Sequence, residues 1–227
     1  MKVELLSYTD LSVCDIAISK CYGKEPYEEL EKQQARINRV ANVSKHASTI
    51  EHLVYSFDID GCSRALLQEL ARHRHQNLTV RSTRYTLKEL KNEKSFIGVY
   101  GYEFNRASKY VVLTHDLDTN EAIVDSLEAT RKLIINGLSN DIAKYSLTEA
   151  YKTSLVSTFN ARSLQNFLSL RSSKHALWEI QLLANAMYDC IPGEHKFLFE
   201  NVMNQLLEKP YGCDSGYLNE LTPNKNL

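Results

Sequence analysis

The residues best suited to chemistry lie in two stretches of the chain that contain no acidic residue. The first stretch, 70–88, has no Asp or Glu, although the whole chain holds 28 of them. Its arginines and histidines are Arg72, His73, Arg74, His75, Arg81 and Arg84. A guanidinium group keeps its charge and presents a planar fork of donors that suits phosphate oxygens or the edge of a base. This stretch therefore predicts a pocket for anionic, hydrogen-bonding ligands such as nucleotides.

The second stretch, 150–178, is also free of Asp and Glu. Its basic residues are Lys152, Arg162, Arg171, Lys174 and His175. Asn160 and Asn166 add neutral donors, and Arg162 lies four residues before Asn166, so a helix would turn both toward a common ligand. The pattern again indicates binding of an anion that also needs hydrogen bonds.

Other interpretations of the same residues remain open at this point. Arg72 and Arg74 could simply stabilise a helix C-terminus through the helix dipole. His73 and His75 share no helix face and have no third ligand nearby, which argues against a metal site, so we predict none. No aromatic residue interrupts 72–84, which disfavours an RNA-binding surface. The glycine-rich phosphate loops and the nucleophile elbow of hydrolases are absent from the sequence.

Three ordered blocks resemble the flavin-dependent thymidylate synthase family. Arg72-His73-Arg74, seven further residues, Ser82 and then Arg84-Tyr85 match the signature of that family. The segment from Asn160 to Ile180 is similar to its C-terminal helical block, and Ser48 to His52 is similar to its upstream histidine motif. The likeness extends over roughly residues 44–194.

Membership would imply an enzyme, a methyltransferase that reductively methylates dUMP to dTMP in nucleotide biosynthesis. Bound FAD would be its cofactor, methylenetetrahydrofolate its carbon donor and NADPH its reductant. The resemblance implies a homotetramer whose active sites draw residues from several subunits. It implies no cysteine nucleophile, and no nucleic acid or membrane as a partner. The alternative, from another class, is a non-catalytic nucleotide-binding or RNA-binding protein of the same fold.

The resemblance also implies roles for individual residues. Arg171 is the expected catalytic residue, because it matches the arginine that binds the uracil edge and favours ionisation at N3. The residues expected to bind dUMP are Glu69, Arg72, Ser82, Thr83, Arg84, Lys144 and Arg171. The residues expected to bind FAD are His52, Val54, Arg72, His73, Arg74, Asn160, Ala161, Arg162, Asn166 and His175. Glu51 and His52 could instead form a structural hydrogen-bonded pair.

Regular elements must hold these side chains in place. Apolar residues recur at helical spacing, and the helices that they predict cover 15–21, 27–43, 64–72, 118–137, 161–171, 174–189 and 194–207. Ser63 is the expected N-cap of the third helix, and Gly137 the expected C-cap of the fourth. Alternation of apolar and polar residues predicts strands over 52–60, ending at Gly61, and over 153–158. Helices outnumber strands without alternating with them, so we predict an α+β fold with a small antiparallel or mixed sheet.

The composition limits the class of protein. A chain of 227 residues with 43% hydrophobic residues can form a folded domain, and we predict a single domain over 1–227 with a polar tail near 222–227. The net charge of -1 argues against a general nucleic-acid coat protein. Five isolated cysteines, together with no signal-like or membrane-spanning apolar run, predict a cytoplasmic location.

Overall fold

The computed structural model describes residues 1–203, which form two compact units. Among these residues, unit 1 comprises 1–60, 69–79 and 155–203, and unit 2 comprises 61–68 and 80–154. The predicted polar tail near 222–227 lies outside the described residues. No helix within residues 1–203 is both long enough and apolar enough to cross a membrane.

A four-stranded sheet has the strand order β1-β2-β6-β3. Its strands are β1 (Lys2–Tyr8), β2 (Val54–Ser63), β3 (Gln76–Val80) and β6 (Lys152–Asn160). β1 runs antiparallel to β2, with Val3 opposite Ile59 and Leu5 opposite Phe57. The strands predicted over 52–60 and 153–158 correspond to β2 and β6. The predicted α+β fold class is confirmed.

The sheet also corrects two expectations. Gly61 does not end the second strand, because its backbone, at φ +76°, is accommodated within β2, which continues to Ser63. β1 was missed, since only part of the segment alternates and its side chains are mostly exposed, so the strand is defined by its pairing with β2.

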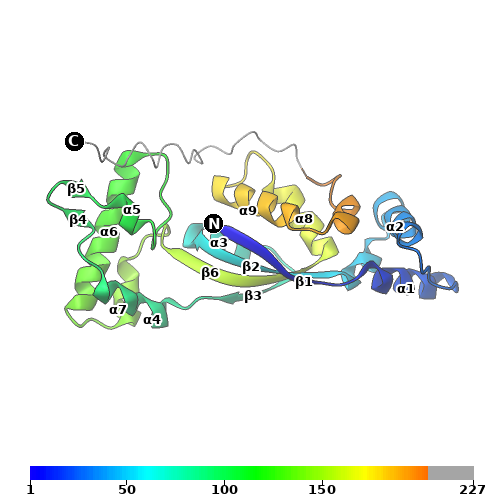
Figure 1. The fold of residues 1–227 in the computed structure, drawn as a ribbon, viewed down its shortest axis with the longest axis horizontal. Helices are drawn as coiled ribbons and strands as arrows, with labels where there is room; N and C mark the ends of the chain where they lie inside the picture. Colours follow the sequence, from blue (N-terminus) through cyan, green and yellow to red (C-terminus); the bar gives the residue numbers. More distant parts are fainter. Residues whose placement is uncertain (204–227) are drawn as a thin grey trace. The chain divides into compact units, whose positions relative to one another are not determined.

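The helices of unit 1 follow the predicted apolar periodicity. They are α1 (Leu11–Tyr22), α2 (Leu30–Asn38), α8 (Ala161–Arg171) and α9 (Trp178–Asp189), with a π-helical turn at Arg39–Val43 and a 3₁₀ turn at Ala47–His52. Figure 1 shows α8 and α9 lying along one face of the sheet. Buried side chains from the two layers form the core, among them Tyr55, Phe57, Phe159, Leu164, Phe167 and Leu183. Burying each of these apolar side chains contributes about 1.5–3 kcal/mol.

Two predicted helices near the end of the described chain need correction. α9 begins at Trp178 and not at Lys174, because the carbonyl of Leu177 is the first to accept helical hydrogen bonds, from the N–H groups of Ile180 and Gln181. The segment Gly193–Leu198 is a 3₁₀ turn and not the start of an α-helix. The rest of that predicted helix, from residue 204, lies outside the described residues.

Unit 2 is built around the long helix α6 (Leu117–Ile135). Shorter elements around it are the strands β4 (Ile97–Gly98) and β5 (Gly101–Tyr102), the helices α4 (Thr83–Thr86), α5 (Phe104–Ala107) and α7 (Asn140–Ala143), and the 3₁₀ turns Leu87–Asn92 and Lys144–Ser146. Gly137, at φ +89°, follows α6 and donates its N–H to the carbonyl of Ile134, so the predicted glycine C-cap is confirmed. The core of this unit includes Leu90, Phe96, Val124, Leu127 and Ile134.

Helix α3 (Arg64–Ala71) begins in unit 2 and ends in unit 1, and it leads into the first basic stretch. The hydroxyl of Ser63 accepts a hydrogen bond from the N–H of Leu66 at 2.9 Å, which confirms the predicted N-cap. α3 ends at Ala71, one residue before Arg72, so the arginines fall in the loop that follows the helix.

Candidate functional site

The loop after α3 turns its two arginines and its central histidine in opposite directions. The side chain of Arg72 is 78% exposed, and Arg74 is also exposed, whereas His73 is buried. The Arg-His-Arg tripeptide therefore offers two cations to solvent while its imidazole faces the protein interior.

The His73 ring is fixed by α8. Its Nε2 lies 3.0 Å from the carbonyl oxygen of Ser163 and 3.1 Å from the Ser163 hydroxyl, and the ring packs against Phe159 and Phe167. Burial lowers the pKa of His73, and the nearby charge of Arg171 acts in the same direction. The lowered pKa favours the neutral imidazole, and the contacts with Ser163 anchor the loop to α8.

Two further contacts hold the same loop. The side-chain amide of Gln76 donates to the carbonyls of Leu70 and His73, and its oxygen accepts from the Ser157 hydroxyl at 3.1 Å. His75, between the tripeptide and β3, has φ +62°, a left-handed backbone conformation that is uncommon for residues other than glycine. Gln76 and Ser163 were not among the predicted site residues, because neither belongs to a sequence motif that marks such anchoring.

The first turn of α8 lies next to this loop. The carboxamide oxygen of Asn160 caps the helix by accepting the Ser163 N–H at 2.8 Å. Ala161 is buried, and its N–H donates to the carbonyl of Leu53 at 2.7 Å. Two of the N–H groups at this helix start are therefore already bonded within the protein, so donors for an anion must come mainly from side chains.

Arg162 and Asn166 supply such side chains on the exposed face of α8. They lie one helical turn apart, as the spacing predicted. Arg162 Nη1 lies 2.7 Å from Oε1 of Glu51, in the 3₁₀ turn before β2. The Glu51 carboxylate, which the sequence suggested as a partner for His52, thus binds Arg162.

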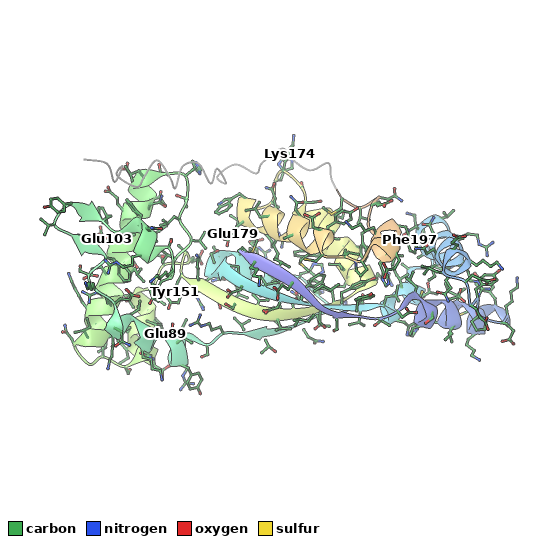
Figure 2. All side chains as sticks on the ribbon, viewed as in Figure 1. Glu89, Glu103, Tyr151, Lys174, Glu179 and Phe197 are labelled. Carbon is green, nitrogen blue, oxygen red and sulfur yellow. The ribbon has the colours of Figure 1, made fainter. Side chains whose placement is uncertain are left out.

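The remaining predicted flavin contacts also lie in unit 1. His52 and His175 are exposed, and His175 follows Lys174 in the connection between α8 and α9, where Figure 2 labels Lys174. Val54 is 36% exposed at the start of β2. Its N–H donates to the Thr9 hydroxyl and its carbonyl accepts from the Thr9 N–H, so both of its backbone groups have partners within the protein.

Arg171 ends α8 and is held by a single residue of α3. Its Nη1 lies 2.8 Å from Oε2 of Glu69, and its Nη2 lies 3.0 Å from the backbone carbonyl oxygen of Glu69. The Arg171 side chain is 19% exposed, and its buried Nε has no hydrogen-bond partner among residues 1–203. The predicted catalytic arginine therefore keeps donors that are not used by the protein.

In unit 2, a carboxylate brings two of the predicted dUMP residues together. Nε of Arg84 lies 2.9 Å from Oδ1 of Asp141, and Nζ of Lys144 lies 3.9 Å from the same oxygen. No sequence motif marks Asp141, because it lies outside the acid-free stretches. Ser82 precedes α4, and its carbonyl accepts hydrogen bonds from the Tyr85 N–H and the Thr86 hydroxyl.

A hollow of about 300 Å³ lies in unit 2 beside these residues. Its lining consists of Arg64, Thr83, Lys144, Tyr145, Leu147, Thr148 and Glu149. Two of the predicted dUMP residues, Thr83 and Lys144, therefore border one cavity. Residues 1–203 contain no cluster of three or more His, Cys, Asp or Glu side chains arranged to hold a metal ion.

Comparison with known proteins decides the family. The family model described as thymidylate synthase complementing protein matches residues 4–195, which contain all three ordered motif blocks. A flavin-dependent thymidylate synthase of Campylobacter jejuni (strain RM1221) is 51% identical over 211 residues, covering 92% of this chain and 100% of the relative. The chain belongs to the flavin-dependent thymidylate synthase family.

Other flavin-dependent thymidylate synthases agree with this assignment. A relative from Wolinella succinogenes is 50% identical, with 88% of this chain and 97% of the relative covered. The crystal structure of thymidylate synthase X from Helicobacter pylori, solved with FAD and dUMP, matches with a TM-score of 0.86 and 44% identity. That match covers 90% of this chain and 100% of the Helicobacter chain.

The residues predicted for the two ligands divide between the units in different ways. All ten predicted flavin contacts lie in unit 1. They lie on the loop after α3, at the end of β6 and on α8, in the 3₁₀ turn before β2 and at the start of β2, and in the connection after α8. Of the predicted dUMP contacts, Glu69, Arg72 and Arg171 lie in unit 1, and Ser82, Thr83, Arg84 and Lys144 lie in unit 2. Within each unit the predicted residues gather on a few neighbouring elements.

Proposed function

We propose that this chain is a flavin-dependent thymidylate synthase that reductively methylates dUMP to dTMP. The observation that carries the proposal is the family match over residues 4–195 together with relatives of 45–51% identity named for this activity. Methylenetetrahydrofolate would supply the one-carbon unit and NADPH the reducing equivalents. The enzyme class expected from the sequence, a methyltransferase, agrees with this family.

In this proposal, Arg171 binds the uracil edge of dUMP. Its guanidinium is fixed at Nη1 and Nη2 by Glu69, while the second hydrogens of Nη1 and Nη2 remain as donors. A fixed cation next to the ring stabilises the anion formed when N3 loses its proton. The electron-rich ring is then more nucleophilic at C5, the carbon that is methylated.

We assign the phosphate of dUMP to the basic group of unit 2. Arg84 and Lys144 share Asp141 in this structure, and Ser82 and Thr83 add hydroxyl groups at the start of α4. The Arg84–Asp141 pair is exposed, and such a pair contributes at most about 1 kcal/mol. A phosphate dianion could therefore replace the carboxylate as the partner of Arg84 at little cost.

We assign FAD to the exposed face of unit 1 formed by Arg74, Arg162, Asn166, His52 and His175. Cations for the diphosphate and amide or imidazole groups for the flavin ring are both present in this set, so the donor chemistry fits the cofactor. When bound, the flavin supplies the hydride-transfer chemistry of the reaction. The protein residues bind and orient it, and the His73 anchor fixes the loop that carries Arg72 and Arg74.

Assembly and location complete the proposal. We infer a homotetramer whose active sites draw residues from several copies of the chain. A reducing, cytoplasmic compartment agrees with the four cysteines of residues 1–203, all of which are free thiols.

The visible spectrum of the purified protein tests the cofactor assignment. We expect flavin absorbance, release of FAD on heating in near-equal ratio to chains, and NADPH oxidation that dUMP stimulates. A folded protein that is colourless and does not bind added FAD would support the alternative, a non-catalytic nucleotide-binding protein.

A further inference from the structure

Glu69 binds Arg171 through two different groups, its side chain and its own backbone. The carboxylate accepts from Nη1 at 2.8 Å and the carbonyl oxygen accepts from Nη2 at 3.0 Å. These contacts join Arg171, the last residue of α8, to Glu69 in the last turn of α3. Because two acceptors from one residue engage two guanidinium nitrogens, they fix both the position and the plane of the Arg171 group.

The pair is partly shielded from water. The side chain of Arg171 is 19% exposed and that of Glu69 is 33% exposed. The other cation near Glu69 is Arg72, whose Nη1 lies 3.7 Å from Oε1, but that side chain is 78% exposed and the contact is long. Arg171 is therefore the main partner of the Glu69 carboxylate, and the charge of Glu69 acts mainly on Arg171.

A count of donors shows what remains for a ligand. A guanidinium has five N–H groups, and Glu69 takes one from Nη1 and one from Nη2. Nε is buried and has no hydrogen-bond partner within the described residues. Because Nε is buried, the donors of Arg171 that remain for a ligand are the Nη1 and Nη2 hydrogens that Glu69 does not take.

We propose that Glu69 is a positioning residue for Arg171, which orients the guanidinium toward the uracil of dUMP and limits its effective charge. This inference deepens the proposed function and rests on it, since it takes Arg171 as the residue that binds the base. It revises the expected role of Glu69, from direct dUMP contact to action through Arg171. It also explains how a carboxylate can lie in a site for an anionic nucleotide, because Arg171 neutralises it.

The two parts of this role predict different effects. If Glu69 orients Arg171, removing its side chain should misplace the guanidinium, and a displacement of about 1 Å in an active site can cost about 100-fold in rate. If the Glu69 charge weakens the field of Arg171, replacing it by a neutral side chain should stabilise the N3-ionised uracil further. The pKa of bound uracil would then fall, and activity would persist to lower pH.

Glu69→Gln and Glu69→Ala separate these effects. Glutamine keeps an oxygen acceptor of similar reach but has no charge, so kcat should change by less than about fivefold. The acidic limb of the kcat/KM profile against pH should move to lower pH, and the pH dependence of the dUMP Kd should move with it. In Glu69→Ala, we expect kcat to fall by at least tenfold and the dUMP Kd to rise.

Gln68→Ala is the matched control. Gln68 is the preceding residue of α3, is exposed, and its amide lies 3.2 Å from the Glu149 carboxylate, so its loss should leave the pH profile unchanged. If Glu69 served only as a structural support for α8, its substitution would lower the melting temperature without moving the pH profile. Thermal melts of all variants show whether each one is folded.

The outcomes distinguish this inference from the function on which it rests. Suppose that the unmodified chain binds FAD and forms dTMP. If both Glu69 variants then keep kcat and the dUMP Kd within twofold and leave the pH profile unmoved, Glu69 does not position Arg171. A lower melting temperature with an unmoved pH profile would equally overturn the inference. If the unmodified chain forms no dTMP, the proposed function itself fails, whatever the variants do.

Discussion

His73 and Ser163 connect the loop after α3 to the first turn of α8, with the imidazole Nε2 3.0 Å from the Ser163 carbonyl oxygen. The Ser163 hydroxyl in turn donates a hydrogen bond to the backbone carbonyl of Arg74 at 3.0 Å. Two reciprocal contacts therefore hold the middle of the Arg-His-Arg tripeptide inside the fold and leave Arg72 and Arg74 facing outward. In this structure the motif is a histidine anchor with a cation on each side.

Acid should destabilise unit 1 through its buried histidines. Burial lowers the pKa of both His73 and His195 below the ordinary value of 6.5, so the unfolded chain takes up protons first as the pH falls. The free energy of unfolding should therefore be highest above about pH 6.5 and decrease below it, by at most about 1.4 kcal/mol per pH unit for each histidine. Urea titrations that follow Trp178, the single tryptophan of the chain, report on unit 1.

Two variants control that measurement. His195→Phe keeps a ring between Tyr8 and Tyr55 but cannot titrate, so it should lower stability at pH 7.5 and reduce the pH slope. His115→Asn changes an exposed residue of unit 2 and should leave the slope intact. A slope that is the same in all three proteins would show that His195 does not contribute to it.

Arg74→Ala should weaken FAD binding. The exposed guanidinium of Arg74 is available to the cofactor phosphates, and a hydrogen bond to a charged group contributes about 1.5–3 kcal/mol, which corresponds to an increase in Kd of roughly 10–150-fold. Flavin content of the purified protein and fluorescence titration with FAD measure the effect. Arg39→Ala removes another exposed arginine of unit 1, on the π-helical turn after α2, and should retain normal flavin content. Equal flavin content in both variants would exclude Arg74 from the FAD site.

Arg84→Ala should raise the KM for dUMP by roughly 10-fold or more, because it removes a cation assigned to the phosphate. Arg81→Ala is a close control, since Arg81 lies three residues earlier and its Nη2 donates to both carboxylate oxygens of Glu89, at 2.9 and 3.0 Å. Steady-state kinetics should show a KM within about threefold of the unmodified value for Arg81→Ala. If the two variants behave alike, the phosphate assignment is wrong.

The sequence predicted the elements whose cause is local. The apolar periodicity of α6 and α8, the Ser63 cap and the alternation along β6 are properties of short segments, and the structure confirms them. β1 was missed because its place is set by pairing with β2, which is far along the chain. The start of α9 was placed too early, because helix periodicity does not mark the residue whose carbonyl accepts the first bond.

For the candidate site, the sequence predicted which residues to consider but not how they are paired. The acid-free stretches suggested unneutralised cations, yet Arg162, Arg84 and Arg171 bind the carboxylates of Glu51, Asp141 and Glu69. Each of these partners lies outside the stretch that contains its arginine. Such long-range contacts depend on the fold, and no spacing rule within a stretch could reveal them.

Formation of dTMP from dUMP by the purified chain tests the central claim most directly. The assay would contain FAD, methylenetetrahydrofolate and NADPH, and mass spectrometry of the nucleotide would detect the added methyl group. We predict dTMP formation by the unmodified chain and at least a 100-fold lower rate for Arg171→Ala with its fold and flavin content retained. A folded, flavin-loaded chain that forms no dTMP, or an Arg171→Ala variant that forms it at the normal rate, would contradict the account.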